Sequence, residues 1–581
     1  MEKRWVIKQP GDERIVGELA QVLNIDPQLA NLLVQRGIHN FKEAKDYFRP
    51  DLNDLHDPFL MKDMDKAVQR IRKAIDNNEK ILVYGDYDVD GTTAVALIYT
   101  FFHSFYTNLD FYIPDRYAEG YGISYKGIDY AVENNFSLVI VLDCGIKAID
   151  KIKYAKDRNL DFIICDHHRP GDEIPDAYAV LDPKRSDCSY PYKELSGCGV
   201  GFKLIQAYSI EYRLPKEKLD SFLDLVVVSI AADIVPITGE NRILAYYGLK
   251  LINRKPRPGF EAILHCGGID REEASTGPYL FNREITISDI VFLVGPRINA
   301  AGRIENANNS VELLITSNRK YAEQLADQIN NLNIERKSLD LSATQEALEF
   351  IQNDEHLKNC KSTVVFNPNW HKGVIGIVAS RLTEYYYRPT IVLTQSNGFI
   401  TGSARSIKDF DIYDAVDYCS DLLEHFGGHK YAAGLSLRPE KLPAFKEKFE
   451  EYVKSHTHEE MLIPEIEIDT VIQLNEINTR FYKILKQLAP FGPGNMAPIF
   501  QTDGVRDTGN ARKVGKNHLK LEVFHPDISV YPVPAIAFQQ GHLLEKIHTE
   551  KSFSICYHLE ENEWNGKKTL QLNIKDIKFP E

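Results

Sequence analysis

The sequence has 581 residues, which at about 150 residues per domain is enough for roughly four domains. Its hydrophobic fraction of 43% and charged fraction of 26% exclude a mainly disordered or collagen-like chain. With 69 Lys+Arg against 83 Asp+Glu, the formal net charge of −14 argues against a histone-like protein that coats duplex DNA through its overall charge. The net charge does not exclude a nucleic-acid substrate, because binding depends on the local charge near the binding site.

The cysteines and the N-terminus bear on the compartment. The 8 cysteines are scattered and form no CxxC pair, which favours a reducing compartment and argues against a structural zinc site of the cysteine type. Charged residues follow Met1 at once, so no signal peptide is visible. No apolar run approaches the ~20 residues of a membrane helix. We therefore expect a soluble, cytoplasmic protein that does not bind membranes.

The first half of the chain predicts helices and then a parallel sheet. About sixty N-terminal residues form a helical pattern, with apolar residues at helical spacing between Leu19 and Leu33. From Lys80, short apolar runs alternate with helical stretches. The runs are Ile81–Tyr84, Leu109–Ile113, Leu138–Leu142, Phe162–Cys165 and Tyr178–Leu181, and the stretches are Thr92–His103, Lys126–Asn134 and Lys147–Arg158. Continuous apolar strands separated by helices predict a parallel sheet covered on both faces.

The second half predicts a long helix, a further α/β unit and a β-rich end. Helices dominate from Val200, and no Gly or Pro interrupts Arg303–Asn367, so Lys320–Asn353 predicts one helix of roughly 50 Å. A second α/β unit follows, with strands Thr363–Phe366, Thr390–Leu393 and one through Gly402, and helices Gly373–Tyr386 and Leu442–Lys454. After Ile463, short strands with many turns predict a small β-barrel or sandwich.

Acidic residues follow three of the predicted strands where each strand ends. Asp86, Asp88 and Asp90 follow the first strand, Asp143 follows the third, and the triplet Asp166–His168 follows the fourth. In a parallel sheet these ends lie at one edge, where ligands of α/β folds bind. Gathered carboxylates repel one another unless a cation holds them; Asp oxygens suit Mg²⁺ or Mn²⁺, and added His nitrogen favours Mn²⁺. Two such ions roughly 3.5–4 Å apart can activate a water and stabilise an in-line displacement at phosphorus.

Each of these pieces has a simpler interpretation when taken alone. The spacing Asp-x-Asp-x-Asp-Gly resembles half an EF-hand loop, but no Glu follows at the twelfth position. An isolated strand-end Asp is more often a helix N-cap, and a His-His pair is more often structural. On consecutive strand ends, the pieces together favour a metal site. Asp233 supports this reading, because it ends the apolar helix Leu223–Ala232, where an uncompensated carboxylate is costly.

These motifs resemble those of the DHH phosphoesterase superfamily, which is named for the triplet at Asp166–His168. Ala231–Pro236 resembles the fourth motif of that superfamily. Gly295–Arg303 resembles the RecJ family, the single-strand-specific 5′→3′ exonucleases within it. The resemblance continues at His371–Arg381, Gly402–Ser406 and Gly427–His429, which mark the DHH-associated domain, and at Leu488–Asn495, which marks the entry to an oligonucleotide-binding (OB) domain. It covers about residues 60–570.

The resemblance implies an α/β fold with a defined order of domains. A parallel-sheet DHH domain and a smaller α/β DHH-associated domain are joined by a long helix, and a C-terminal OB-type β-barrel follows. We predict an N-terminal helical segment at 1–60, the DHH catalytic domain at 61–318, the connecting helix at 319–355, the DHH-associated domain at 356–458 and the OB domain at 459–581.

The resemblance also implies a catalytic centre that holds two divalent ions, Mn²⁺ or Mg²⁺. The implied metal ligands are Asp88, Asp90, Asp143, His167 and Asp233. Asp86 is a further metal ligand and His168 a further catalytic residue by the same resemblance. They either complete the coordination of the two ions or orient the ligands and the attacking water without contacting the ions.

A second set of residues predicts a site for a terminal phosphate. Ser403 and Arg405 lie two residues apart, so on a strand both point to one face, where a guanidinium beside a hydroxyl suits a phosphate. By resemblance, the 5′-phosphate site and its surroundings also include Arg116, Arg297, Asn299, Arg303, His371, Gly427, Gly428 and His429. Taken singly, an Arg is more often in a surface salt bridge, Gly-Gly is usually a turn, and His371 could be a simple loop residue before a helix.

The C-terminal β unit carries a basic cluster at Arg512, Lys513, Lys516 and Lys520, near Phe524. A basic groove with aromatic side chains is how OB domains hold single strands. Without the family resemblance, a basic hairpin that is simply exposed to solvent explains these residues as well as a nucleic-acid groove does.

The resemblance implies a metal-dependent exonuclease that degrades single-stranded DNA from its 5′ end to 5′-mononucleotides, in DNA repair and recombination. It also implies a monomer that works with a helicase and a single-strand-binding protein. An alternative in the same superfamily is a hydrolase of short oligoribonucleotides or cyclic dinucleotides, but such proteins generally lack an OB domain, and residues 463–581 need an explanation. A pyrophosphatase is a weaker alternative. A non-catalytic DNA-binding subunit would have lost the ligands found here, and no P-loop of an NTP-driven motor is present.

Overall fold

The computed structural model describes residues 2–272, 279–528, 531–564 and 567–580. The chain forms two compact units, which we describe separately. The large unit comprises His56–Val235 and Gly239–Ile463, and the small unit comprises Met1–Leu55, Pro236–Thr238 and Pro464–Glu581. All eight cysteines are free. Among the described residues, no helix combines the length and the apolar character that crossing a lipid bilayer requires.

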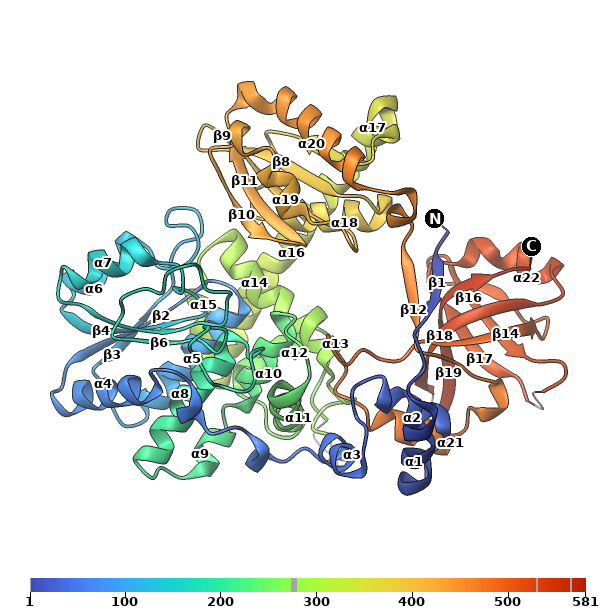
Figure 1. Ribbon diagram of the computed structural model, residues 1–581, viewed down its shortest axis with the longest axis horizontal. Helices are drawn as coiled ribbons and strands as arrows, with labels where there is room; N and C mark the ends of the chain where they lie inside the picture. Colours follow the sequence, from blue (N-terminus) through green and yellow to red (C-terminus); the bar gives the residue numbers. More distant parts are fainter. Residues whose placement is uncertain (1, 273–278, 529–530, 565–566, 581) are drawn as a thin grey trace. The chain divides into compact units, whose positions relative to one another are not determined.

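The first sheet of the large unit is fully parallel, as predicted (Figure 1). Its strand order is β3-β2-β4-β5-β6. The strands are β2 (Lys80–Gly85), β3 (Leu109–Tyr112), β4 (Phe136–Leu142), β5 (Asp161–Cys165) and β6 (Ala179–Leu181). All five predicted strands are confirmed to within two residues at each end. From β2 the chain crosses to β3 on one side, and β4 lies on the other side, so the strand order reverses between β2 and β4.

Helices cover both faces of this sheet. The apolar residues of α6 (Tyr125–Glu133) and α7 (Ile149–Lys156) share a buried cluster with one face. Helices α5 (Val89–His103) and α8 (Gly197–Glu211) pack together against the other face. Both α5 and α8 begin beside the carboxyl ends of the strands, so their N-termini point toward the edge where the acidic residues lie.

Further helices complete this part of the large unit. They are α4 (Met64–Asp76), α9 (Lys216–Asp220), α10 (Leu223–Ala232), α11 (Gly239–Arg254), α12 (Pro258–Cys266), α13 (Ile287–Asp289), α14 (Gly295–Ile304) and α15 (Asn308–Ile315). One wide turn, η3 (Ile290–Val294), precedes α14, and there the amide of Gly295 donates to the carbonyl of Ile290, five residues back. Pro296 accounts for this turn, because its ring lacks an N–H and clashes with the carbonyl four residues back.

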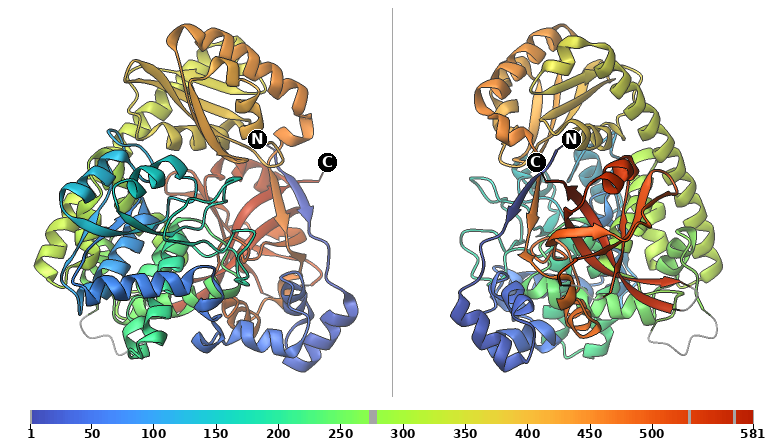
Figure 2. Two further views of the ribbon diagram at one scale, coloured as in Figure 1. Left: turned by 60° about the vertical axis from the view of Figure 1, so that its left-hand side comes forward. Right: turned by 90° about the vertical axis from the view of Figure 1, so that its right-hand side faces the viewer.

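The long helix is α16 (Arg319–Asn353), an unbroken helix of 35 residues (Figure 2). Its first half buries Ala322, Leu325 and Ile329 and packs against α12 and α14. Its second half buries Ala343, Ala347 and Ile351 in a cluster with the second sheet. A single helix therefore carries the chain from the first sheet to the second.

The second sheet has the strand order β10-β11-β9-β8-β7. Its elements are β7 (Thr363–Phe366), β8 (Thr390–Ser396), β9 (Phe399–Arg405), β10 (His425–His429), β11 (Ala432–Leu437), α17 (Glu355–Asn359), α18 (Ile375–Tyr386), α19 (Ile412–Asp417) and α20 (Leu442–His456). Only β7 and β8 are parallel neighbours. Helix α18 covers one face beside α16, and α19 and α20 cover the other. The sequence pattern did not predict β10 and β11.

The small unit contains a closed β-barrel. The sheet order is β13-β14-β18-β19-β17-β16-β15, and an additional β14–β16 pairing closes five of the strands into a ring, the architecture of an OB fold. The elements are β13 (Thr470–Val471), β14 (Phe500–Asp507), β15 (Arg512–Val514), β16 (His518–Phe524), β17 (Val533–Ala537), β18 (Phe553–Trp564), β19 (Lys567–Lys578), α21 (Thr479–Lys486) and α22 (Leu544–Thr549).

The N-terminal segment belongs to the small unit. Strand β1 (Arg4–Ile7) pairs in parallel with β12 (Glu465–Ile468). Helices α1 (Glu13–Leu23), α2 (Pro27–Val34) and α3 (Phe41–Phe48) follow, which confirms the helical character of the segment. Leu29 and Leu32 of α2 are fully buried in the cluster that fills the barrel. The domain boundaries given above stay predictions.

Candidate metal centre

Acidic side chains gather where the strand order of the first sheet reverses. Asp86, Asp88 and Asp90 follow β2, and Asp143 follows β4, the neighbouring strand. Such a reversal opens a crevice at the carboxyl ends of the strands. Asp143 has a left-handed backbone (φ 61°), which turns the chain sharply as it leaves β4.

Asp90 is fixed by the start of α8. Its two carboxylate oxygens accept hydrogen bonds from the amides of Gly197 (2.7 Å) and Cys198 (2.8 Å), and Oδ1 also accepts one from the hydroxyl of Ser229 (2.6 Å). A helix N-terminus stabilises a carboxylate. Position 197 must be glycine, since a Cβ there would lie 2.7 Å from the Cβ of Asp143. The glycine thus lets two acidic residues approach one helix end.

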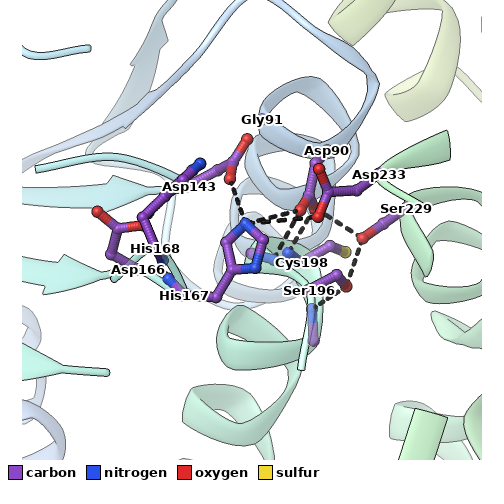
Figure 3. A network of polar contacts seen from close by, with 12 residues as sticks. Asp90, Gly91, Asp143, Asp166, His167, His168, Ser196, Cys198, Ser229 and Asp233 are labelled. Atoms are coloured by element: carbon purple, nitrogen blue, oxygen red, sulfur yellow. Dashed lines mark hydrogen bonds and ion pairs between the residues drawn. The ribbon is translucent and has the colours of Figure 1, made fainter. Parts of the chain in front are cut away.

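His167 lies at the centre of the group (Figure 3). Its Nε2 is 3.1 Å from Oδ1 of Asp143, 3.5 Å from Oδ2 of Asp233 and 3.7 Å from Oδ2 of Asp90. Two overlapping sets have potential ligand atoms within 4.8 Å of one another: Asp90, His167 and Asp233, and Asp143, His167 and His168. The structure therefore brings together five of the predicted catalytic residues.

Asp86 and Asp88 lie beside this group and outside both sets. Asp88 caps α5, and its carboxylate accepts a hydrogen bond from the amide of Gly91 (3.0 Å). Asp86 is 1% exposed, and neither of its carboxylate oxygens has a hydrogen-bond partner among the described residues. Burial, and after it the charge of Asp88, raises the pKa of Asp86 well above its ordinary value.

The electrostatics of the centre fit a divalent cation. Burial, and after it the charge of Asp90, raises the pKa of Asp143 well above its ordinary value and that of Asp233 to about 8. Burial also lowers the pKa of His167, whose ring nitrogens have no hydrogen-bond partner among the described residues. Buried carboxylates that repel one another, around an imidazole with free nitrogens, match the ligands of Mn²⁺ or Mg²⁺.

Asp166 orients His168. Its Oδ1 lies 2.7 Å from Nδ1 of His168, and its Oδ2 accepts a hydrogen bond from the amide of Ile146 (2.9 Å). Burial opposes both charges, but the hydrogen bond between them lowers the pKa of Asp166 to about 2 and raises that of His168 to about 9. The other ring nitrogen of His168 lies 3.3 Å from the hydroxyl of Tyr121. Tyr121, between two glycines with positive φ, is a contact that the sequence motifs did not indicate.

Arg405 lies in a pocket of hydroxyl groups on the second sheet. Its guanidinium donates to Oγ of Ser403 (2.9 Å) and of Ser380 (3.2 Å), and burial lowers its pKa. Within the described part of the chain it has no carboxylate partner. A Cβ at Gly376, in the first turn of α18, would lie 3.0 Å from Nη2 of Arg405. A buried guanidinium beside hydroxyls and a helix N-terminus provides donors for a phosphate.

Arg303 lies among further cations, which include Arg405. Arg303 donates to the carbonyl of Gly373 (3.2 Å). Burial, and after it the charges of Arg116, Arg336 and Arg405, lowers the pKa of Arg303 to about 10. Asp340 pairs with Arg336 (3.1 Å), and the remaining like charges repel one another, so the arrangement favours an anion that neutralises them.

The histidines of the second sheet region lie near this cluster. The ring of His371 packs edge-on against that of Tyr117, and its Nδ1 accepts a hydrogen bond from the amide of Gly373 (3.1 Å). Burial lowers the pKa of His429, and the charge of Arg405 lowers it further. Gly428 precedes His429 with φ 155°, and a Cβ there would lie 2.4 Å from the carbonyl oxygen of Ala432. Gly427 is exposed on β10.

Arg297 and Asn299 lie on α14. The guanidinium of Arg297 donates to Asn330 (3.0 Å) and to the carbonyls of Leu293 (2.8 Å) and Cys266 (2.9 Å). These contacts fasten α14 to its neighbours and leave Arg297 outside the cluster around Arg405. Asn299 is half-buried. A phosphate-binding role for both residues stays a prediction.

In the small unit, the predicted basic residues lie on the β15–β16 hairpin. Arg512 and Lys520 are opposite one another in the antiparallel register, and Lys513 and Lys516 are exposed. Like charges directly opposite destabilise a sheet. Phe538 is half-exposed nearby, with its ring 5.1 Å from that of His518. Paired cations next to an exposed aromatic ring suit a single strand.

Ile234 is a strained residue that the sequence did not reveal. It directly follows Asp233, its φ is 61°, and it is 67% exposed. A β-branched residue at positive φ is a true outlier that costs roughly 1–3 kcal/mol, and such strain clusters at functional sites. The sequence holds only an indirect indication of this strain: an isoleucine lies between two motif residues, at a turn where Gly or Asn would be favoured.

Three family models match the chain. The DHH family, N-terminal domain, matches residues 80–230; the DHHA1 domain matches residues 359–455; and the RecJ OB domain matches residues 468–576. The matches cover the first sheet, the second sheet and the barrel.

Curated proteins and solved structures are similar over the whole chain. The single-stranded-DNA-specific exonuclease RecJ of Bacillus subtilis (strain 168) is 38% identical over 100% of this chain and 71% of its own length. The single-stranded-DNA-specific exonuclease RecJ of Escherichia coli (strain K12) is 32% identical over 97% of this chain and 98% of its own length. The crystal structure of RecJ in complex with Mn²⁺ from Thermus thermophilus matches 100% of this chain and 80% of that chain, with a TM-score of 0.84 and 26% identity.

Proposed function

The chain belongs to the RecJ family of single-stranded-DNA-specific exonucleases, and on that premise we propose that it hydrolyses single-stranded DNA from the 5′ end to 5′-mononucleotides. One observation carries the direction of attack. The acidic centre on the first sheet and the buried Arg405 on the second sheet belong to one unit, and after burial the charges of Arg405 and His168 both lower the pKa of His429, which therefore lies within electrostatic range of both. A strand end bound at Arg405 would therefore lie beside the catalytic residues.

The residues of the centre would hold two divalent cations, Mn²⁺ or Mg²⁺. Asp90, Asp143, His167 and Asp233 supply the ligands, with Asp86, Asp88 and His168 beside them. When bound, such cations activate a water and neutralise charge at the phosphodiester. The free nitrogens of His167 and the unpartnered oxygens of Asp86 support this assignment.

The residues of the chain itself orient the reacting groups. Asp166 keeps the proton on Nδ1 of His168 and turns the other ring nitrogen toward Tyr121. Ser403 and Arg405 bind the 5′-phosphate, with Arg303 and Arg116 adding positive charge. Asp90 is held in place by three donors, so it cannot swing away as the strand enters.

The barrel of the small unit would bind the strand at the hairpin that carries Arg512 and Lys520. We also propose, from the family resemblance, a monomeric cytoplasmic protein that acts in DNA repair and recombination with a helicase and a single-strand-binding protein as partners.

A digestion assay tests the proposal. The protein is incubated with Mn²⁺ or Mg²⁺ and single-stranded DNA labelled at either end, beside duplex DNA, a dinucleotide and pyrophosphate. We expect release of the 5′-terminal mononucleotide from single strands and little cleavage of duplex. Digestion from the 3′ end, or preference for the dinucleotide, would overturn the proposal.

A further inference from the structure

One face of the second sheet is only half covered. Helix α18 packs on this face over β7, β8 and β9. Strands β11 and β10 continue the sheet beyond the helix, and their residues on this face are mostly small. Gly434 and Gly427 lie side by side in the register, and a Cβ at either position would meet no atom within 4 Å. The sheet surface beyond α18 is therefore bare.

The register arranges this face in rows that cross three strands. Arg405, Ala432 and His429 form the first row, Ser403, Gly434 and Gly427 the second, and Thr401, Ser436 and His425 the third. Residues paired in this way point to the same face. Each row lies about 7 Å from the next, since a strand rises about 3.4 Å per residue. The charge of His168 contributes to lowering the pKa of His429, so the first row lies within electrostatic range of the metal centre, and the third row lies about 14 Å from the first along the strands.

A cavity of about 420 Å³ opens over the second and third rows. Its polar wall is formed by Lys372, Thr401, His425 and Ser436 with the two glycines Gly427 and Gly434, and Phe399, Phe426 and Leu435 also line it. None of the described Asp and Glu residues lines it. Among the described residues, Lys372 has no ion pair, and burial, followed by the charge of Arg116, lowers its pKa. Hydroxyls, an imidazole and a free ammonium without any carboxylate make a surface for an anion.

This cavity adjoins the proposed 5′-phosphate site along the strands of the second sheet. Arg405 lies in the first row and Ser403 in the second, and the cavity continues from the second row to the third. A group attached to the outer oxygen of the terminal phosphate would therefore enter the cavity, where Lys372, Thr401 and Ser436 could donate to it.

We propose that this cavity is a subsite for the outer phosphates of a strand that ends in a 5′-triphosphate, so that such ends are degraded as well as monophosphate ends. The inference rests on the proposed function and deepens it. The terminal phosphate site is open at its outer side, and Lys372 is a specificity-determining residue for polyphosphate ends.

The experiment compares three single strands of one sequence that carry a 5′-hydroxyl, a 5′-monophosphate or a 5′-triphosphate. The label is at the 3′ end, and the initial rate with Mn²⁺ is measured for the full chain. The variants are Lys372→Gln, which removes the cation, and Ser436→Phe, which fills the third row. Lys441→Gln, an exposed lysine of the same region, is the matched control. Thermal unfolding of each variant shows that it is folded.

We expect the wild-type protein to digest the triphosphate strand within about tenfold of the monophosphate strand. Lys372→Gln should lower the rate ratio of triphosphate to monophosphate by about tenfold, the size of one charge-assisted hydrogen bond, and Ser436→Phe should lower it further. Lys441→Gln should leave the ratio unchanged.

Two results would overturn the inference while the proposed function stands. In the first, the monophosphate strand is digested but the triphosphate strand is more than about a hundredfold slower. In the second, both variants lower the two rates equally. Failure to digest any of the three strands would overturn the proposed function itself, and this inference with it.

Discussion

Oδ1 of Asp143 lies 3.1 Å from Nε2 of His167, a contact that joins the ends of two neighbouring strands of the first sheet. Neither atom has a hydrogen-bond partner among the described residues. Both are buried, so the contact brings together an oxygen and a nitrogen that still have coordination capacity. This arrangement makes Asp143 the most informative position for substitution.

Asp143→Asn should lower cleavage of single-stranded DNA by at least about a thousandfold, because the amide keeps the shape but loses the charge that a divalent cation needs. Strand binding, measured by fluorescence anisotropy, should change little, since the cations around Arg405 and the barrel remain. Asp157→Asn, at an exposed position, is the control. Cleavage near the wild-type rate in Asp143→Asn would remove Asp143 from the centre.

Divalent cations should stabilise the protein. After treatment with a chelator, addition of Mn²⁺ should raise the Tm, because a cation that binds only the folded state stabilises it by about 2.7 kcal/mol at a hundred times its Kd. The shift should be much smaller in Asp143→Asn. An equal shift in both proteins would place the bound ion somewhere else.

Asp166→Asn should lower kcat by about 10- to 100-fold and leave the KM for single-stranded DNA nearly unchanged. Asp166 holds the ring of His168 and accepts a hydrogen bond from the amide of Ile146, and neither contact involves the proposed phosphate site. Carboxylates that orient a histidine at a metal site typically contribute about 10- to 100-fold to activity. Steady-state kinetics separates the two constants, and a change in KM alone would contradict a positioning role.

Arg405→Ala should reduce the preference for a 5′-phosphate over a 5′-hydroxyl end by about 10- to 100-fold, the loss of one or two charge-assisted hydrogen bonds. Arg405→Lys should restore part of it, because lysine supplies charge without the bidentate geometry. Arg438→Ala, on a residue paired with Glu424 in the same region, is the control. If Arg405→Ala slows the digestion of both strands equally, the 5′-phosphate binds at another site.

Ile234→Gly should not destabilise the metal-free protein, although it removes a large side chain. The native φ of 61° costs isoleucine roughly 1–3 kcal/mol, and glycine adopts it freely, which offsets the higher chain entropy of glycine. We expect the Tm in chelator to stay level or rise, and the affinity for Mn²⁺ to fall because Asp233 becomes less constrained. A clear fall in Tm would show that the conformation is unstrained.

Much of the fold was predictable because its signals are local. The five apolar runs of the first sheet and the Gly- and Pro-free stretch of α16 are dictated by burial and helix propensity, and both are confirmed. Strands β10 and β11 were not predicted, because their glycines and alanines lie on a partly uncovered face of the sheet and give no alternating apolar pattern.

The candidate site was predictable only where residues follow strands directly. Strand order alone brings Asp90, Asp143 and His167 together. The amides that hold Asp90 come from a helix more than a hundred residues away, and no local pattern marks them. The contacts of Arg297 were likewise not indicated by its motif: its guanidinium donates to one side chain and two carbonyls, and its phosphate-binding role stays a prediction.

The pairing of β1 with β12 has a consequence for biosynthesis. The first strand finds its partner only after residue 468 has left the ribosome, so the N-terminal helices wait while more than four hundred residues are made. At about 5–20 residues per second, that wait is on the order of 20 to 90 s. During it, Leu29 and Leu32 lack the barrel that buries them. The large unit, encoded between the two halves of the small one, can complete its fold first, and the barrel closes last.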